Sequence, residues 1–389
     1  MLGSKDKNCT YIFFSILLIC INIFLVSIIS LSPVYFAFVI SMGMLFILFS
    51  FYPRFQIGRL RMDDKILILL SLLLCVNVTI TTAINNGNIS SFITYIFSVI
   101  CFTLSFTVTQ IPKRNIKKTF YLFKYISLLL FVVEVIYRFS YSQAKHSYFY
   151  FYDYKHNSIM FPDTNATAVC IEFFLAFLLY LKTRNVIKIY LLEILIGFVL
   201  LFLTFSRAAL FGLVCFGAIW FFLKCKSYIV KYLMLMSVFI AGIVIITVFI
   251  KDGSFITKLD LYAQTFDYIQ RVDYLHLFIG NGLDSSVNIL TRYGHTFVTL
   301  YIVELGINNF ILLLALLSIL VFKTKYSLFL IVPYIVSGAS YMPFVIPFFY
   351  LYLGLIYNLE YYRNDLFDKR EVRRKKYERV LRICFTNRR

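Results

Sequence analysis

The sequence predicts an all-α integral membrane protein, and its composition and hydropathy pattern support this. The chain has 389 residues, of which 61% are hydrophobic, and its mean hydropathy is +0.82. A soluble domain of this size cannot bury so much apolar surface, whereas the bilayer interior accommodates it. The apolar residues form long runs, and no polar stretch between them is long enough for a second folded domain. We therefore expect residues 1–389 to form a single polytopic membrane domain.

The apolar runs predict about 12 membrane-spanning helices, because most are close to the about 20 residues that a crossing helix needs. The predicted spans are 11–31, 33–51, 66–84, 91–111, 119–139, 163–181, 189–204, 207–223, 232–250, 305–322, 326–341 and 343–360. The first run is too long for the apolar part of a signal peptide, so it should remain as a span.

The net charge of +19 indicates topology rather than nucleic-acid binding. With the N-terminus inside, these spans place most of the 38 Lys and Arg residues on one face. The other face keeps only Arg138, Lys145, Lys155, Arg207, Lys251, Lys258, Arg271 and Arg292. Cytoplasmic loops of membrane proteins carry such an excess, so both termini are predicted to be cytoplasmic. The basic cytoplasmic tail, 361–389, suits contact with anionic lipid heads, and we expect no nucleic-acid partner.

One large extracytoplasmic loop, 251–304, is predicted between helices 9 and 10. Apolar residues recur there at helical spacing and predict an amphipathic helix over 257–278; they are Phe266, Ile269, Val272 and Leu275. Gly280-Asn281-Gly282 should end that helix. A thirteenth crossing at 295–306 would export the basic tail, so we expect an outer-side or re-entrant helix over 295–305.

Arg207 interrupts an apolar stretch from Ile189 to Leu223 that is too long for one crossing. An isolated arginine costs about 2.5–3.5 kcal/mol at the centre of a span, so Arg207 should lie where the chain turns at the membrane face. There it can act as an interfacial anchor, or it can bind a phosphate through its two-pronged guanidinium. The sequence leaves both readings open.

Other polar residues on the predicted outer face are candidates with structural alternatives. Arg271 can bind a ligand or pair with Asp267 on a solvated helix face. His295 can deprotonate a hydroxyl or cap a helix, and Glu304 is not placed to form a dyad with it. Asp163 is a good N-cap for the following helix. The eight cysteines fall in spans or inner segments, which predicts neither a disulfide framework nor a metal site.

Three glutamates within the predicted spans should face the interior of the bundle, because a carboxylate is costly in lipid. They are Glu134, Glu172 and Glu193. Glu172 lies in the middle of its span, where it could pair with an arginine, relay protons or hydrogen-bond a neighbouring helix.

The order of these motifs resembles the O-antigen polymerase and O-antigen ligase superfamily. Thr204-Phe205-Ser206-Arg207-Ala208 is similar to its T-x-S-R-G/A signature, Arg271 precedes Gly280-Asn281-Gly282, and His295 precedes Glu304-Leu305-Gly306. Asp163-Thr164-Asn165 resembles the Asp-Pro-Asn element with threonine in place of proline. His295 is followed by threonine where the family has asparagine. The resemblance covers about 160–310.

The resemblance implies an inverting, metal-independent glycosyltransferase of the bacterial cytoplasmic (inner) membrane that needs no cofactor. In the polymerase form, the donor is a glycan on undecaprenyl pyrophosphate, and the acceptor is a sugar hydroxyl of another lipid-linked repeat unit on the periplasmic side. The implied catalytic residues are Arg207 and Arg271, which would stabilise the leaving pyrophosphate, and His295, which would position or deprotonate the hydroxyl. The implied substrate contacts are Arg207, Arg271, Asp163, Asn165, Glu304 and Arg292.

Two alternatives remain open from the sequence. An O-antigen ligase, which transfers the glycan to lipid A–core, has nearly the same motifs. A flippase of lipid-linked oligosaccharides belongs to another class and is often built from two related halves, which this sequence does not show. The sequence also leaves open the sugars, the linkage, and whether a polysaccharide chain-length regulator binds.

Overall fold

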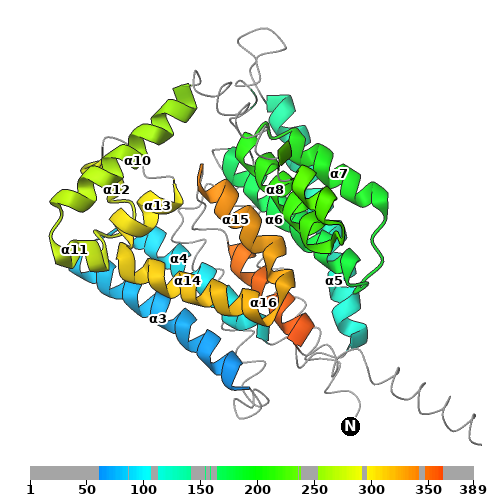
Figure 1. Ribbon diagram of the computed structural model, residues 1–389, viewed down its shortest axis with the longest axis horizontal. Helices are drawn as coiled ribbons and strands as arrows, with labels where there is room; N and C mark the ends of the chain where they lie inside the picture. Colours follow the sequence, from blue (N-terminus) through cyan, green and yellow to red (C-terminus); the bar gives the residue numbers. More distant parts are fainter. Residues whose placement is uncertain are drawn as a thin grey trace, which may run out of the picture.

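The protein is all-helical in the part of the chain that its computed structural model describes (Figure 1). The described residues are 61–85, 87–106, 113–141, 154, 158, 164–234, 236, 237, 253–290, 296–340 and 347–361. The predicted spans 11–31 and 33–51, most of span 232–250 and the tail beyond Tyr361 lie outside them.

The helices follow the predicted order of spans. They are α3 (Met62–Asn85), α4 (Ile89–Leu104), α5 (Lys113–Tyr141), α6 (Thr164–Thr183), α7 (Leu191–Phe202), α8 (Arg207–Lys224), α10 (Gly253–Arg271), α11 (Tyr274–Ile279), α12 (Ser286–Ile289), α13 (Phe297–Thr299), the π-helix η4 (Leu300–Glu304), α14 (Gly306–Lys323), the 3₁₀-helix η5 (Lys325–Ser327), α15 (Leu328–Gly338) and α16 (Pro347–Tyr361). Each predicted span that lies in the described part coincides with one of α3 to α8 or α14 to α16.

Among the described residues, the helical segments long and apolar enough to cross a membrane are Met62–Asn85, Phe120–Tyr141, Thr164–Thr183 and Gly306–Lys323. In the other helices that match predicted spans, the apolar segments are shorter than 18 residues. The 12 residues of α7 extend about 18 Å, less than the about 30 Å of hydrocarbon in a bilayer. The described part is thus an α-helical membrane protein, and the number of crossings stays a prediction.

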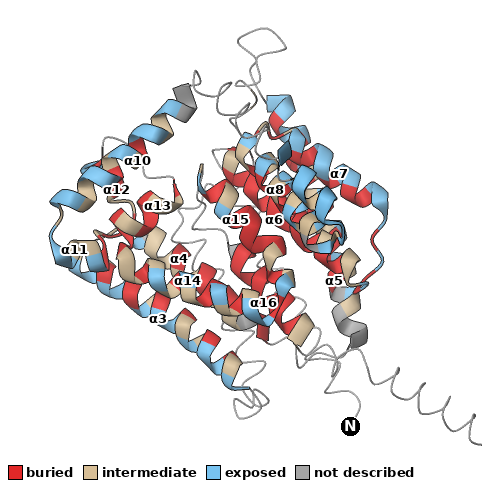
Figure 2. Cartoon of the chain, in the orientation of Figure 1, coloured by how far each residue is buried: buried red, intermediate tan, exposed pale blue. Residues whose placement is uncertain are grey.

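The centre of the bundle is α6, which packs against α7, α8, α15 and α16. Of its 18-residue apolar window, 89% is buried, so protein rather than lipid surrounds it (Figure 2). Aromatic stacking joins it to α16, where the rings of Phe177 and Tyr352 lie 4.6 Å apart with 3° between their planes. Because α16 also packs on α4, it connects α6 to the group formed by α3, α4 and α14 (Figure 1).

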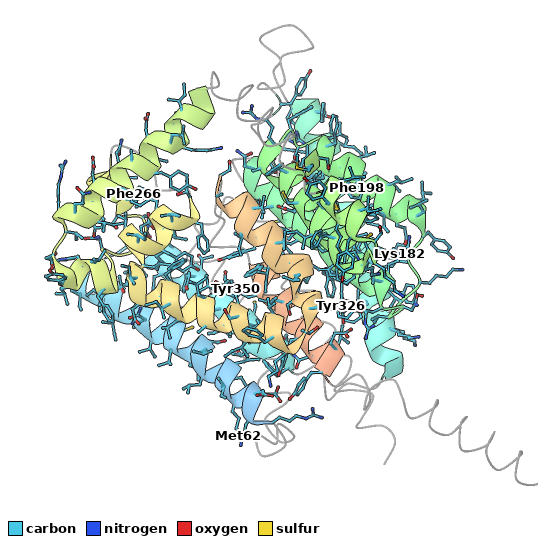
Figure 3. The ribbon with its side chains drawn as sticks, viewed as in Figure 1. Met62, Lys182, Phe198, Phe266, Tyr326 and Tyr350 are labelled. Carbon is cyan, nitrogen blue, oxygen red and sulfur yellow. The ribbon has the colours of Figure 1, made fainter. Side chains whose placement is uncertain are left out.

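The bundle has two chemically different ends. At the basic end α3 begins and α6, α8, α14 and α16 terminate; at the loop end α3 terminates and α6, α8 and α14 begin. Described cations near the basic end are Arg61, Lys65, Lys182, Arg184, Lys224, Lys226, Lys323 and Lys325. In Figure 3, Met62 and Tyr326 lie toward this end and Phe266 lies toward the other. The charge segregation predicted from the sequence is therefore present in the described helices.

The three span glutamates are buried, as predicted. Glu134 accepts a hydrogen bond from Arg138 Nε at 2.9 Å, and Glu193 lies 2.6 Å from Lys124 Nζ. Arg138, which the predicted topology puts on the outer face, has a fully buried side chain. Its Nη1 donates to the carbonyl oxygen of Tyr154 at 2.9 Å, whereas its Nη2 finds no hydrogen-bond partner among the described residues.

Glu172 packs between α6, α8 and α15, and among the described residues no arginine pairs with it. Its carboxyl oxygens find no hydrogen-bond partner among the described residues. Ser337 lies near the carboxyl group, but its hydroxyl donates instead to the carbonyl oxygen of Pro333 at 2.5 Å. A Cβ atom at Gly212 would collide with Glu172 Oε1, so this glycine makes room for the carboxyl group.

The helix predicted over 257–278 is wrong as a single element, because α10 ends at Arg271 and α11 begins at Tyr274. Asp273 causes the break, since its side chain caps α11 by accepting from the backbone N–H of His276. The face of α10 that packs against the protein is not the apolar face named from the sequence. It consists of Leu261 and Thr265, whereas Phe266 is 60% exposed.

Candidate functional site

The turn between α7 and α8 presents Arg207 at the loop end of the bundle. Thr204 Oγ1 donates to the carbonyl oxygen of Leu201 at 2.6 Å and accepts from the N–H of Ser206 at 3.3 Å. Phe205 takes a left-handed conformation with φ of 55°, which costs a non-glycine residue of order 1–3 kcal/mol. This strained turn reverses the chain so that exposed Arg207 becomes the first residue of α8.

Two helices begin on this side of the bundle, because α6 and α8 pack together and both start at the loop end (Figure 1). The first turn of a helix has unsatisfied N–H groups and a positive partial charge. Thr164 Oγ1 and Ser206 Oγ are fully buried there and have no hydrogen-bond partner among the described residues. Asn165 is half-buried in the same turn of α6. Together with Arg207, these groups form a set of donors suited to an anion.

The outer loop brings two of the sequence motifs into direct backbone contact. The N–H of Gly282 donates to the carbonyl oxygen of Glu304 at 2.9 Å, and the N–H of Asn281 donates to that of Val303 at 3.0 Å. Gly280, with φ of 84°, lies against Gly306, with φ of 78°. A Cβ atom at either glycine would collide with the backbone of the other segment. Sequence spacing gave no indication that Gly280-Asn281-Gly282 and Glu304-Leu305-Gly306 pair.

Glu304 is the buried polar centre of this contact, with a relative exposure of 3%. Its carboxyl group accepts from the backbone N–H of Asp284 at 3.0 Å, and Ser286 lies beside it. Burial raises the pKa of Glu304 to about 7. The geometry therefore supports a role for Glu304 in holding the loop, and its predicted contact with substrate stays a prediction.

The helices α3 and α4 fix this loop to the bundle. Thr81 Oγ1 donates to the carbonyl oxygen of Ile279 at 2.5 Å, and Asn85 Nδ2 donates to that of Gly280 at 2.9 Å. The Ser91 hydroxyl donates to the carboxylate of Asp284. These polar groups were not singled out in the sequence, because only the fold reveals that the loop returns to the end of α3.

The segment before α14, expected to be an outer-side or re-entrant helix, is helical in its described part, and its place relative to the membrane stays a prediction. It consists of α13 and η4, which are too short to cross a membrane, and the positive φ of Gly306 separates them from α14. A π-helical turn such as η4 is rare and occurs frequently at functional sites.

Arg271 is the last residue of α10 and points to solvent, with 82% of its side chain exposed. Its guanidinium lies 4.0 Å from the carboxylate of Asp267, which is 63% exposed. Such an exposed pair contributes little energy, so it leaves Arg271 available to a ligand.

The structure describes only some of the catalytic residues that the family resemblance implies. Figure 1 shows α8 and α10 on opposite sides of α15, so Arg207 and Arg271 belong to separated helices. His295, Arg292 and Asp163 lie outside the described residues.

The described residues include no group of three or more His, Cys, Asp or Glu side chains that could hold a metal ion. Comparison with family models, curated proteins and solved structures finds no match to this chain.

Proposed function

We propose that this protein is a membrane glycosyltransferase that joins lipid-pyrophosphate-linked oligosaccharide units, as an O-antigen or surface polysaccharide polymerase. The observation that carries the proposal is the anion site at the start of α8. There Arg207, two helix starts and the unpartnered hydroxyls of Thr164 and Ser206 gather at the end of the bundle opposite the basic end. We assign this anion site to a lipid pyrophosphate because of the order of motifs along 160–310.

In this mechanism, an acceptor hydroxyl oxygen attacks the anomeric carbon of the donor sugar from the side opposite the pyrophosphate. The new glycosidic bond forms as the bond from the anomeric carbon to the pyrophosphate oxygen breaks. The hydroxyl proton passes to His295, and the electron pair leaves with undecaprenyl pyrophosphate. Arg207 and Arg271 stabilise the negative charge that develops on that leaving group, which lowers the barrier.

The activity test uses purified full-length protein with undecaprenyl-pyrophosphate-linked repeat units, and it follows product length. We expect a ladder of longer lipid-linked glycans from the unmodified protein. Arg207→Ala should slow extension by about 10²–10³-fold, because it removes a donor to the developing charge. Arg207→Lys should restore little, since lysine cannot form a bidentate phosphate contact. Lys226→Ala, which removes a cation at the basic end, is the matched control.

Other outcomes would assign another function. Transfer only to lipid A–core would identify a ligase. Movement of the lipid-linked unit across a vesicle membrane without bond formation would identify a flippase. Full extension by Arg207→Ala would remove the anion site from the mechanism.

A further inference from the structure

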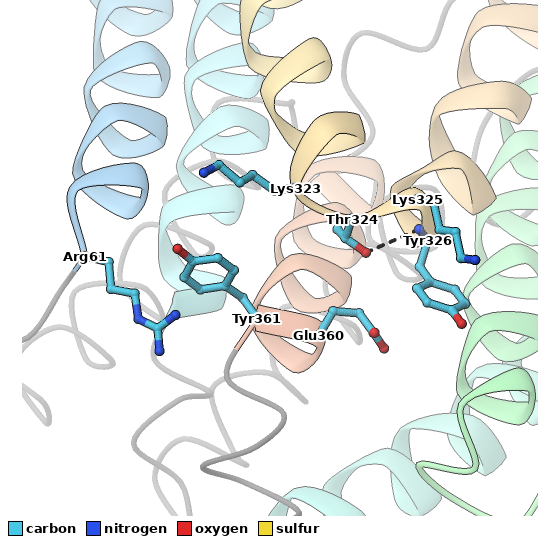
Figure 4. Close-up of a pocket in the computed structure, with 7 residues that line it drawn as sticks. All are labelled: Arg61, Lys323, Thr324, Lys325, Tyr326, Glu360 and Tyr361. Carbon is cyan, nitrogen blue, oxygen red and sulfur yellow. Dashed lines mark hydrogen bonds between the residues drawn. The ribbon is translucent and has the colours of Figure 1, made fainter.

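A pocket of about 360 Å³ opens at the basic end, between the start of α3, the junction of α14 with η5, and the end of α16 (Figure 4). Its lining carries the cations Arg61, Lys323 and Lys325 against one carboxylate, that of Glu360. The volume lies within the about 300–1,000 Å³ of ordinary ligand pockets. The residues assigned above to glycosyl transfer do not line it.

The carboxylates of Glu360 and Asp63, in and beside this pocket, already have cationic partners. Glu360 accepts from Arg184 Nε at 2.6 Å and from Arg184 Nη2 at 2.7 Å, a two-pronged ion pair. Asp63 accepts from Lys323 Nζ at 2.6 Å and from the hydroxyl of Tyr361 at 2.8 Å. These bonds tie α3, α14 and α16 together, so the acidic groups hold the walls in place.

Two of the lining cations lie near the faces of aromatic rings. The guanidinium of Arg61 lies 4.5 Å from the ring centroid of Tyr361, and Lys325 Nζ lies 5.9 Å from that of Tyr326. Among the described residues, no carboxylate lies within ion-pair distance of Lys325 Nζ. An oxyanion in the pocket would gain charge-assisted hydrogen bonds from these side chains.

Apolar surface adjoins the pocket on both helices that flank it. Met62 follows Arg61 and is 71% exposed, and Phe322 precedes Lys323 and is 87% exposed. Exposed Ile66 continues this surface along α3. A soluble anion would use only the pocket, whereas a lipid would also cover these side chains with its acyl chains.

We propose that this pocket binds the phosphate headgroup of an anionic phospholipid from the cytoplasmic leaflet, with the acyl chains along α3 and α14. Basic pockets between helices on the cytoplasmic side of membrane proteins are suited to such headgroups. The proposal concerns lipid binding alone and does not depend on the glycosyltransferase assignment.

The binding test titrates detergent-purified full-length protein with phosphatidylglycerol, and in parallel with phosphatidylcholine, and counts bound lipids by native mass spectrometry. The test variant is Arg61→Gln with Lys325→Gln. The control variant is Lys224→Gln with Lys226→Gln, which removes the same charge from the basic end, at the last residue of α8 and just beyond it. Phosphatidylglycerol should bind the test variant about 30-fold more weakly, because each cation contributes about 1 kcal/mol, while the control variant binds it normally.

Equal weakening in both double variants would overturn the proposal, since it would show a general effect of surface charge. Phosphatidylcholine binding as tight as phosphatidylglycerol would also overturn it. A parallel titration with inorganic phosphate tests whether the pocket binds a soluble anion instead of a lipid. If phosphate raises the thermal unfolding midpoint as much as phosphatidylglycerol does, the pocket serves a soluble phosphate and the lipid assignment fails. Unfolding midpoints without added lipid verify that both variants are folded.

Discussion

Glu304 shows, at the scale of a single residue, how burial changes the chemistry of a side chain. The sequence placed this carboxyl group at the edge of the membrane, and the structure encloses it beneath the loop of Gly280-Asn281-Gly282. Burial raises the pKa of Glu304 from 4.5 to about 7, because the charged form loses its hydration. The folded state therefore binds a proton that the unfolded chain releases at lower pH.

Glu304→Gln should remove a pH dependence from the stability of the outer loop. The stabilising contribution of protonated Glu304 is fully present below about pH 4.5 and is lost as the pH rises through about 7. Glutamine resembles the protonated acid, so the variant should be more stable than the unmodified protein at pH 8, by up to about 3 kcal/mol. Thermal unfolding midpoints between pH 5 and pH 8 measure this difference. The control Asp267→Asn changes an exposed carboxylate and should leave the dependence of the midpoint on pH unchanged. If the midpoint of Glu304→Gln follows pH in parallel with that of the unmodified protein, the assignment to Glu304 is contradicted.

At the scale of elements, the contact between the two glycine-containing segments positions the outer loop on α3 and α14. Gly306→Ala should destabilise the protein by at least about 2 kcal/mol. It forces alanine into a left-handed conformation and drives its Cβ atom into the backbone near Gly280. Gly217→Ala in α8 is the matched control, because no atom lies within 4 Å of the added Cβ, and it should stabilise the helix by up to about 1 kcal/mol. Thermal unfolding in detergent compares the two, and equal midpoints would show that the segments do not touch.

The buried ion pair between α5 and α7 makes a second prediction at this scale. Lys124 is fully buried and its Nζ lies 2.6 Å from Glu193 Oε1. Glu193→Gln should cost about 3–5 kcal/mol, because it leaves a buried ammonium group without its partner. The double variant Lys124→Met with Glu193→Gln should be more stable than Glu193→Gln alone. Strictly additive losses in a double-mutant cycle of unfolding free energies would contradict a coupled pair.

At the scale of the whole molecule, the separation of charge predicts which end faces the cytoplasm. Tyr274 at the loop end is 92% exposed, and Lys226 is exposed at the basic end. A membrane-impermeant thiol reagent applied to intact spheroplasts should label Tyr274→Cys above the background of native cysteines. It should label Lys226→Cys only after permeabilisation, because cytoplasmic segments carry the excess of Lys and Arg. The reverse pattern would invert the topology and move the proposed anion site at Arg207 to the cytoplasm.

How far the sequence predicts this protein depends on the kind of interaction. The helices at 66–84, 119–139, 163–181 and 305–322 follow from runs of apolar residues, and the structure places helices there. The break at Asp273 was missed, because the apolar spacing of 257–278 continues through the capping residue that ends one helix and begins another. Local apolar spacing indicates a helical face but does not show where a polar cap will interrupt it.

The candidate site, too, could be predicted from the sequence only in part. The turn before Arg207 could be predicted, because an arginine inside a long apolar stretch is tolerated only at a membrane boundary. The buried pair of Lys124 with Glu193 could not be predicted, because the fold brings together two residues from different helices. The pair of Arg138 with Glu134 is different, since a spacing of four residues in one helix already makes them neighbours. Like the pair of Lys124 with Glu193, the pocket at the basic end draws on helices that are far apart in the sequence.

By itself, the sequence determined the membrane environment, the order of the helices and the segregation of basic residues, since each follows from apolar length and the cost of charge in hydrocarbon. Only the tertiary structure decided the contact between Gly280-Asn281-Gly282 and Glu304-Leu305-Gly306, the burial of Glu304 and the gathering of helix starts at the loop end. These features arise from close packing between segments distant in the chain, and the hydropathy of a segment carries no information about which neighbour will complete its hydrogen bonds.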